Sequence, residues 1–232
     1  MFTTPREAAT VSIIRDGENT IEVLLMKRHG NDRFLPNYHV FPGGAMDPQD
    51  YEYKFSCDKE IKHIEKFDCD YKKYYGFIMC AVRETFEESG ILLAVDEDGN
   101  YPVINTKKII KKFTDYRKLV FENSLSFKEM LMKEKLKPAI NNLFYIDRHI
   151  TPFISPIRYD TRFFAAILPD NQELSPDGDE LISFEWITPL DGLLKYEDRK
   201  IKLVRPTIKT LEFLNEFGSS DELIAYFNDC AE

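Results

Sequence analysis

Short runs of apolar residues, several of them alternating with polar ones, predict a set of β-strands along the chain. The predicted strands cover residues 8–14, 21–27, 38–41, 91–95, 162–168 and 181–186. Residues 23–26 are all apolar, which is typical of a strand buried on both faces. Ile182, Phe184 and Trp186 alternate with other residues and indicate a strand with one buried face. Pro42-Gly43-Gly44 predicts a turn after the third strand.

Helical spacing predicts four further regions. These are residues 76–90, 107–142, 205–217 and 220–227. Gly90 supplies the stop of the first helix, and Ser126 with Glu129 three residues later predicts a capped second segment inside 107–142. Residues 47–75 are polar and rich in Lys and Asp, which indicates a surface insertion.

The mixed order of strands and helices, without a regular βαβ rhythm, predicts an α/β (α+β) sandwich. A length of 232 residues fits one domain, covering 1–232, with insertions at about 47–75 and 107–145.

Composition narrows the functional classes. The 31 basic and 40 acidic residues give a net charge of −9, which argues against nucleic-acid and membrane partners. The first ten residues lack an apolar core of the kind found in signal peptides, and the four cysteines form no CxxC pair. We therefore expect a cytoplasmic protein that acts on a small molecule, and its oligomeric state stays open.

The helix at 76–90 carries the most informative pattern. At about 100° per residue, Glu84, Glu87 and Glu88 share an arc of about 100°. Ile78, Val82 and Phe86 fall on the opposite side. One face is therefore expected in the core and the other to present three carboxylates.

Three carboxylates this close repel one another, so a cation should offset them. Arg83 lies one turn before Glu87 and can pair with it. Oxygen ligands without His or Cys favour Mg²⁺ or Mn²⁺. A solvated acidic face would carry the same three glutamates. The Gly-Gly segment before the helix and Gly90-Ile91 after it favour the metal site.

These residues resemble the Nudix hydrolase family, whose box runs G-x5-E-x7-R-E-U-x-E-E-x-G-U, with U a bulky apolar residue. Residues 83–91, RETFEESGI, match its second half except at Thr85. Gly44 matches the leading glycine, but it lies 39 residues before Arg83 where the box has 14, which leaves a 25-residue insertion. Counting back from Arg83 puts Tyr75 where the box has its first Glu.

The resemblance extends to the acyl-coenzyme A diphosphatase branch of the family. Residues 34–47, FLPNYHVFPGGAMD, carry it together with the expanded box and residues 161–164, TRFF. Residues 186–190, WITPL, and 205–207, RPT, are also similar, as is a helical insertion at 107–142. The resemblance implies a Nudix-type α/β/α sandwich with a mixed sheet and an inserted helical segment.

The resemblance also implies roles for the box residues. Glu84, Glu87 and Glu88 would bind Mg²⁺ or Mn²⁺, and the Gly43 carbonyl can add a ligand. Glu84 is the first candidate for the general base, although the residue that acts as base varies within the family. Arg83 would orient the glutamates through an ion pair. A further acid from a later loop is expected at Glu180, with Asp179 and Glu173 as rivals.

Phosphate contacts are expected from Arg28, Arg33 and Arg162, because the guanidinium fork suits phosphate oxygens, and from the bare backbone at Gly44. The leading hypothesis is a metal-dependent hydrolase that cleaves the pyrophosphate bond of a nucleoside diphosphate derivative. Coenzyme A or an acyl-coenzyme A is the first candidate for its substrate. An ADP-ribose or dinucleotide pyrophosphatase is the second hypothesis, and a non-catalytic nucleotide sensor is the third.

Overall fold

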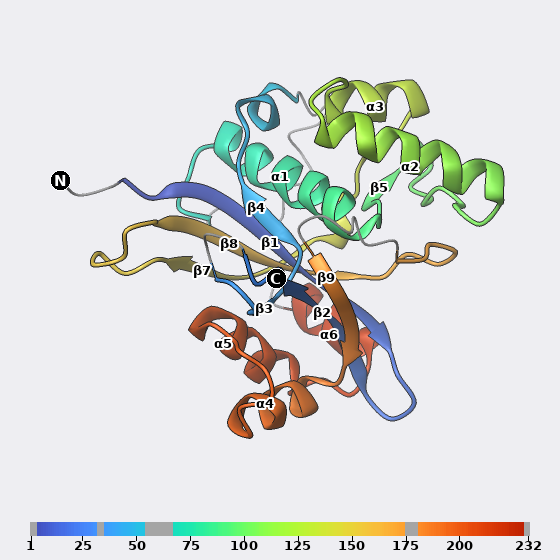
Figure 1. The fold of residues 1–232 in the computed structure, drawn as a ribbon. Coiled ribbons are helices and arrows are strands. Elements are labelled where there is room, and N and C mark those ends of the chain that lie inside the picture. Colours follow the sequence, from blue (N-terminus) through green and yellow to red (C-terminus); the bar gives the residue numbers. More distant parts are fainter. Residues whose placement is uncertain (1–3, 32–34, 54–66, 175–180, 230–232) are drawn as a thin grey trace.

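The computed structural model describes residues 4–31, 35–53, 67–174 and 181–229 (Figure 1). Its strands are β1 (Arg6–Asp16), β2 (Ile21–Arg28), β3 (His39–Val40), β4 (Gly43–Ala45), β5 (Ala94–Val95), β6 (Lys137–Pro138), β7 (Phe144–Ile150), β8 (Tyr159–Ile167) and β9 (Leu181–Ile187). Its α-helices are α1 (Tyr71–Ser89), α2 (Lys107–Phe121), α3 (Phe127–Glu134), α4 (Pro189–Glu197), α5 (Arg205–Leu214) and α6 (Ser220–Asp229).

The main sheet is mixed and has β1 near its centre. β1 runs parallel to β8 and antiparallel to β2 and β4, and β7 extends the sheet beyond β8. β3 and β9 both pair with β2. Figure 1 shows α1, α2 and α3 on one face of this sheet and α4, α5 and α6 on the other. The predicted α/β/α sandwich with a mixed sheet is confirmed.

Each face of the sheet has its own apolar core. In β2, Leu24 and Met26 pack toward α1, whereas Val23 and Leu25 pack toward α5. Because side chains alternate along a strand, the apolar run in β2 is buried on both faces, as predicted. β2 is thereby fixed between the two helical layers.

Helix α1 begins at Tyr71, five residues before the predicted start. The Asp70 side chain caps it by accepting a hydrogen bond from the Lys73 amide at 2.9 Å. Tyr74 and Tyr75 are buried in the core of this face. The prediction of a surface insertion over 47–75 is therefore wrong for its last residues. Residues 71–75 form the first turn of α1, and Tyr74 and Tyr75 in this turn belong to the core.

The predicted helical insertion is confirmed as α2 and α3. Ser126 and Glu129 form the expected capping box at the start of α3. The helix ends at Glu134, however, and the chain continues through β6 into β7. Neither β7 nor α4 was predicted from the sequence.

The structure also differs from the prediction at Gly43-Gly44, where a strand replaces the predicted turn. Gly43, Gly44 and Ala45 form β4, which pairs with Thr10, Ala9 and Ala8 of β1. A Cβ at Gly43 would lie 2.4 Å from the Ala9 carbonyl oxygen. Glycine at this position therefore allows two backbones to approach closely. No helix in the described ranges is long and apolar enough to cross a membrane.

Candidate active site

The three glutamates of α1 line one cavity. Ile78, Val82 and Phe86 are fully buried in the core, as the helical spacing predicted. Glu84, Glu87 and Glu88 instead line a cavity of about 260 Å³, here called the carboxylate cavity. Its other lining residues are Arg28, Gly43, Gly44, Ala45 and Phe121. The predicted carboxylate face therefore opens onto enclosed space and is not a fully solvated surface.

Strand β4 forms the wall opposite these glutamates. The Gly43 amide donates a hydrogen bond to Glu88 Oε2 at 2.8 Å. A Cβ at Gly44 would lie 2.6 Å from the carboxylate of Glu84. A larger residue at position 44 would therefore displace the Glu84 carboxylate from this position, and the box glycine serves the geometry of the carboxylates directly.

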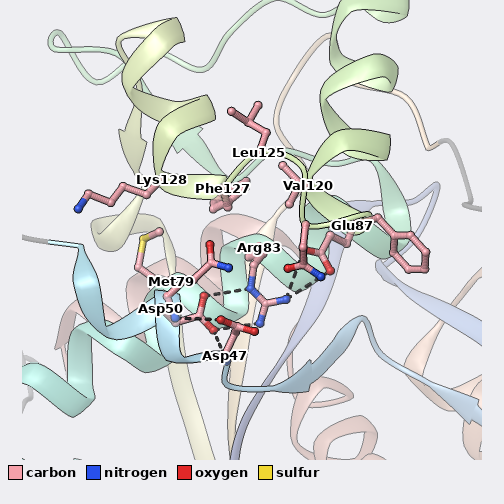
Figure 2. A pocket seen from close by; sticks show the side chains of 12 residues that line it. Asp47, Asp50, Met79, Arg83, Glu87, Val120, Leu125, Phe127 and Lys128 are labelled. Carbon is pink, nitrogen blue, oxygen red and sulfur yellow. Dashed lines mark hydrogen bonds and ion pairs between the residues drawn. The ribbon is translucent and has the colours of Figure 1, made fainter.

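Arg83 lies beside the glutamates and pairs with three carboxylates, of which Figure 2 shows those of Asp50 and Glu87. Its Nη1 is 2.9 Å from Glu84 Oε1 and 3.3 Å from Glu87 Oε2. Its Nε and Nη2 donate to the two carboxylate oxygens of Asp50 at 3.0 and 2.9 Å. A bidentate pair of this kind fixes the guanidinium plane, so Arg83 holds Glu84 and Glu87 in place.

Asp50 was missed by the sequence analysis. It is 2% exposed and lies within the segment predicted to be a surface insertion. Gly44 and Asp50 are separated by five residues, which is the G-x5-E spacing of the box with Asp in place of Glu. Tyr75 was therefore the wrong position for this acid, because the insertion follows Asp50. The available signal was Asp47-Pro48-Gln49-Asp50, which forms a capping box in the structure.

The electrostatics of the cavity favour a bound cation. Burial raises the pKa of Glu84 to about 7, with Arg83 opposing the shift and Glu87 adding to it. In the described part of the chain, no three His, Cys, Asp or Glu side chains are already arranged as a metal site. Three carboxylates nevertheless share one small cavity, and they are the hard oxygen donors that divalent cations prefer. The residues therefore fit a divalent metal ion.

The inserted helices cover this site. The Arg117 Nε atom of α2 donates a hydrogen bond to the Glu87 carbonyl at 2.6 Å. Phe121 at the end of α2 lines both the carboxylate cavity and a neighbouring cavity of about 110 Å³ that contains Asp50 and Arg83. Leu125 and Phe127 line the same smaller cavity, as Figure 2 shows. Residues between 120 and 128 therefore form one wall of the site.

A larger cavity lies next to the carboxylate cavity, on the α5 side of the sheet. It measures about 550 Å³ and is here called the sheet cavity. Strand β4 and Arg28 line both cavities. The sheet cavity is also lined by Phe41, by Tyr159 and Phe163 of β8, and by the start of α5. A ligand bound at the glutamates can therefore extend into it.

The remaining predicted residues have different positions. Arg28 lines both cavities, which agrees with the expected phosphate contact. Arg162 is 2% exposed, lies 4.6 Å from the Phe77 ring centroid and pairs with Asp160 at 2.6 Å. It is absent from the linings of these three cavities, so its placement fits a structural role. Arg33 and Glu180 lie outside the described residues.

The comparisons with known proteins agree with this geometry. Residues 63–214 match the family model described as the NUDT19 Nudix domain. The chain belongs to the Nudix family. The resemblance inferred from residues 83–91 is thereby confirmed, and the acyl-coenzyme A diphosphatase branch is supported by two relatives that carry that name.

The chain is 33% identical to acyl-coenzyme A diphosphatase NUDT19 of Xenopus laevis over 87% of its own length and 62% of the relative's. It is 25% identical to the Gallus gallus protein of the same name, over 90% and 65%. It therefore spans less than two thirds of these curated relatives. A crystal structure of a NUDIX hydrolase from Alicyclobacillus acidocaldarius superposes with a TM-score of 0.80 at 29% identity, covering 97% of both chains.

Proposed function

We propose that this chain is a hydrolase that depends on a divalent metal ion and cleaves the diphosphate bond of coenzyme A or an acyl-coenzyme A. The observation that carries the proposal is a pair of neighbouring cavities whose linings share strand β4 and Arg28. Three box glutamates line the smaller one, and the larger one lies next to it. The names of the Xenopus and Gallus relatives support this substrate class.

The residues of the site would divide the work as follows. Glu84, Glu87 and Glu88 hold the metal ion, Mg²⁺ or Mn²⁺, which when bound neutralises phosphate oxygens and lowers the pKa of water. Glu84 would accept the proton of the attacking water, a role supported by its pKa of about 7, which suits a base at neutral pH. Arg83, fixed by Asp50, keeps Glu84 and Glu87 oriented. Arg28 contacts the diphosphate from the junction of the two cavities.

In the reaction, the water oxygen forms a bond to one phosphorus and the bridging P–O bond breaks. The products are adenosine 3′,5′-bisphosphate and a 4′-phosphopantetheine, or its acyl ester. Each product keeps one phosphorus atom of the cleaved diphosphate, the adenosine product also keeps its 3′-phosphate, and the water supplies the additional oxygen.

The test is a substrate panel with purified protein and millimolar Mg²⁺ or Mn²⁺. It contains coenzyme A, an acyl-coenzyme A, ADP-ribose, NADH and a nucleoside triphosphate, with products separated by chromatography. We expect the coenzyme A compounds to be cleaved fastest and a chelator to stop turnover. Faster cleavage of another compound, with the coenzyme A compounds inert, would contradict the proposed substrate.

A further inference from the structure

The start of α5 lies in the wall of the sheet cavity and has the properties of an anion site. Val204, Arg205, Pro206 and Thr207 all line the cavity. Val204 occupies the N-cap position and makes no capping hydrogen bond through its side chain. The first amides of a helix have no partner within it and carry partial positive charge, so an uncapped start attracts anions.

Thr207 gives independent evidence for a ligand. The residue is 3% exposed, and its hydroxyl is not one of the fully buried side-chain atoms without a partner among the described residues. Within the described part of the chain, its hydroxyl makes no hydrogen bond, although the residue lines the cavity. The hydroxyl of a residue that is otherwise buried, lines the cavity and has no protein partner is available to a bound molecule.

The charges around the cavity agree with this assignment. Arg28 and Arg205 line it, and no Asp or Glu does so among the described residues. This is unusual in a chain with 40 acidic residues and a net charge of −9. Arg205 is exposed and makes no ion pair with any residue that the structure describes, so its guanidinium is available to an anion.

We propose that the start of α5, with Arg205 and Thr207, binds a phosphomonoester group that the substrate carries apart from the diphosphate being cleaved. This rests on the proposed function, which places the diphosphate at the glutamates. Strand β4 and Arg28 line both cavities, so the two lie next to each other and the proposal places one molecule across both. Coenzyme A has such a group at its ribose 3′ position, and 3′-dephospho-coenzyme A is the same molecule without it.

The experiment compares the KM values of these two compounds in three proteins. In Arg205→Gln, we expect the KM for coenzyme A to rise about tenfold, because a charge-assisted hydrogen bond is lost. The KM for the dephospho compound and both kcat values should stay unchanged. Lys209→Gln removes a charge from an exposed position of the same helix and is the matched control, with neither KM changed. An equal rise for both compounds, or no difference from the control, would overturn the proposal.

Thr207→Val tests the hydroxyl separately, with thermal unfolding followed by circular dichroism as the check that the variant folds. We expect a smaller rise of KM that is again confined to coenzyme A. If the wild-type protein cleaves neither compound, the proposed function fails but the subsite can still be measured. Titration calorimetry without metal should then show that adenosine 3′,5′-bisphosphate binds more tightly than AMP, and that Arg205→Gln removes the difference. Equal affinities in the wild-type protein would reject the subsite itself.

Discussion

The carboxylate cavity and the sheet cavity share strand β4 and Arg28, but their other walls carry opposite charge. Three glutamates line the first, whereas the described lining of the second contains no acid and adds Arg205. The first can hold a cation with hard oxygen ligands, and the second can receive an anionic and partly apolar ligand. This difference suggests that one cavity performs the chemistry and the other selects the substrate.

The largest effect should follow from the carboxylate cavity. Glu88→Gln keeps the shape of the side chain and its hydrogen bond from Gly43, but it removes the charge. We expect kcat to fall by roughly 10²–10³-fold, as for loss of one electrostatic group at a reacting centre, with an unchanged circular dichroism spectrum. The exposed Glu212 of α5 provides the control, because Glu212→Gln should leave kcat unaltered. Retained activity in Glu88→Gln would mean that the glutamates are not the chemical site.

Asp50 tests whether the supporting pair matters as much as the glutamates. In Asp50→Asn, we expect kcat to fall about 10–100-fold, since Arg83 would no longer orient Glu84 and Glu87. The free energy of unfolding should also fall, by about 3–5 kcal/mol, because a buried pair is broken. Asp50→Glu should restore part of the activity, since it restores the charge. If kcat is unchanged while stability falls, Asp50 stabilises the fold without positioning the site.

The positions of the glutamates could be predicted from sequence because helical spacing is local information. The Asp50–Arg83 pair could not be found by counting back from Arg83, since the two residues are 33 positions apart with an insertion between them. Strand β7 was missed because Asp147, Arg148 and His149 interrupt its apolar pattern. Pairing with β8, and not the apolar pattern of residues 144–150 themselves, makes this segment a strand.

Arg162 shows a different limit of prediction from sequence, which concerns the direction of a side chain. The sequence predicts that Arg162 opens a strand, but not which face of the sheet its side chain occupies. Its neighbours Thr161 and Phe163 line the sheet cavity, and side chains alternate along β8, so Arg162 points to the opposite face. The order of strands and layers decides this, and that order is not local information.

Arg28 and Arg162 therefore offer a direct comparison between binding and structure. For Arg28→Gln, we expect the KM for coenzyme A to rise about tenfold while thermal stability is unaffected. For Arg162→Gln, we expect unchanged KM and a loss of about 3–5 kcal/mol in unfolding free energy, because Asp160 loses a buried partner. Kinetics and urea unfolding of both variants would measure this. The reverse pattern would show that Arg162, and not Arg28, binds the substrate.

The smallest effect concerns acid stability. Burial raises the pKa of Asp160, but hydrogen bonds from Arg148 and the charge of Arg162 lower it by more, so the net pKa lies below its ordinary value. Asp160 therefore stabilises the fold at pH values above its unfolded pKa of about 3.9, and this contribution is lost as the pH falls through the native pKa.

Urea unfolding of the wild-type protein and Asp160→Asn can measure this contribution. We expect the wild type to be more stable by about 1–3 kcal/mol at pH 7, and the difference to shrink at pH 3. A difference that does not change with pH would show that packing, and not charge, accounts for it.

The most direct test of the account is to locate a metal ion by anomalous diffraction from crystals of the Glu88→Gln and wild-type proteins grown with Mn²⁺ and a coenzyme A analogue whose diphosphate cannot be hydrolysed. In the wild type, we expect a manganese peak within about 2.0–2.6 Å of oxygens from Glu84, Glu87 or Glu88 and of the ligand's diphosphate. The variant should show a weaker peak or none. A manganese ion elsewhere, or a diphosphate that lies away from the carboxylate cavity, would contradict the account.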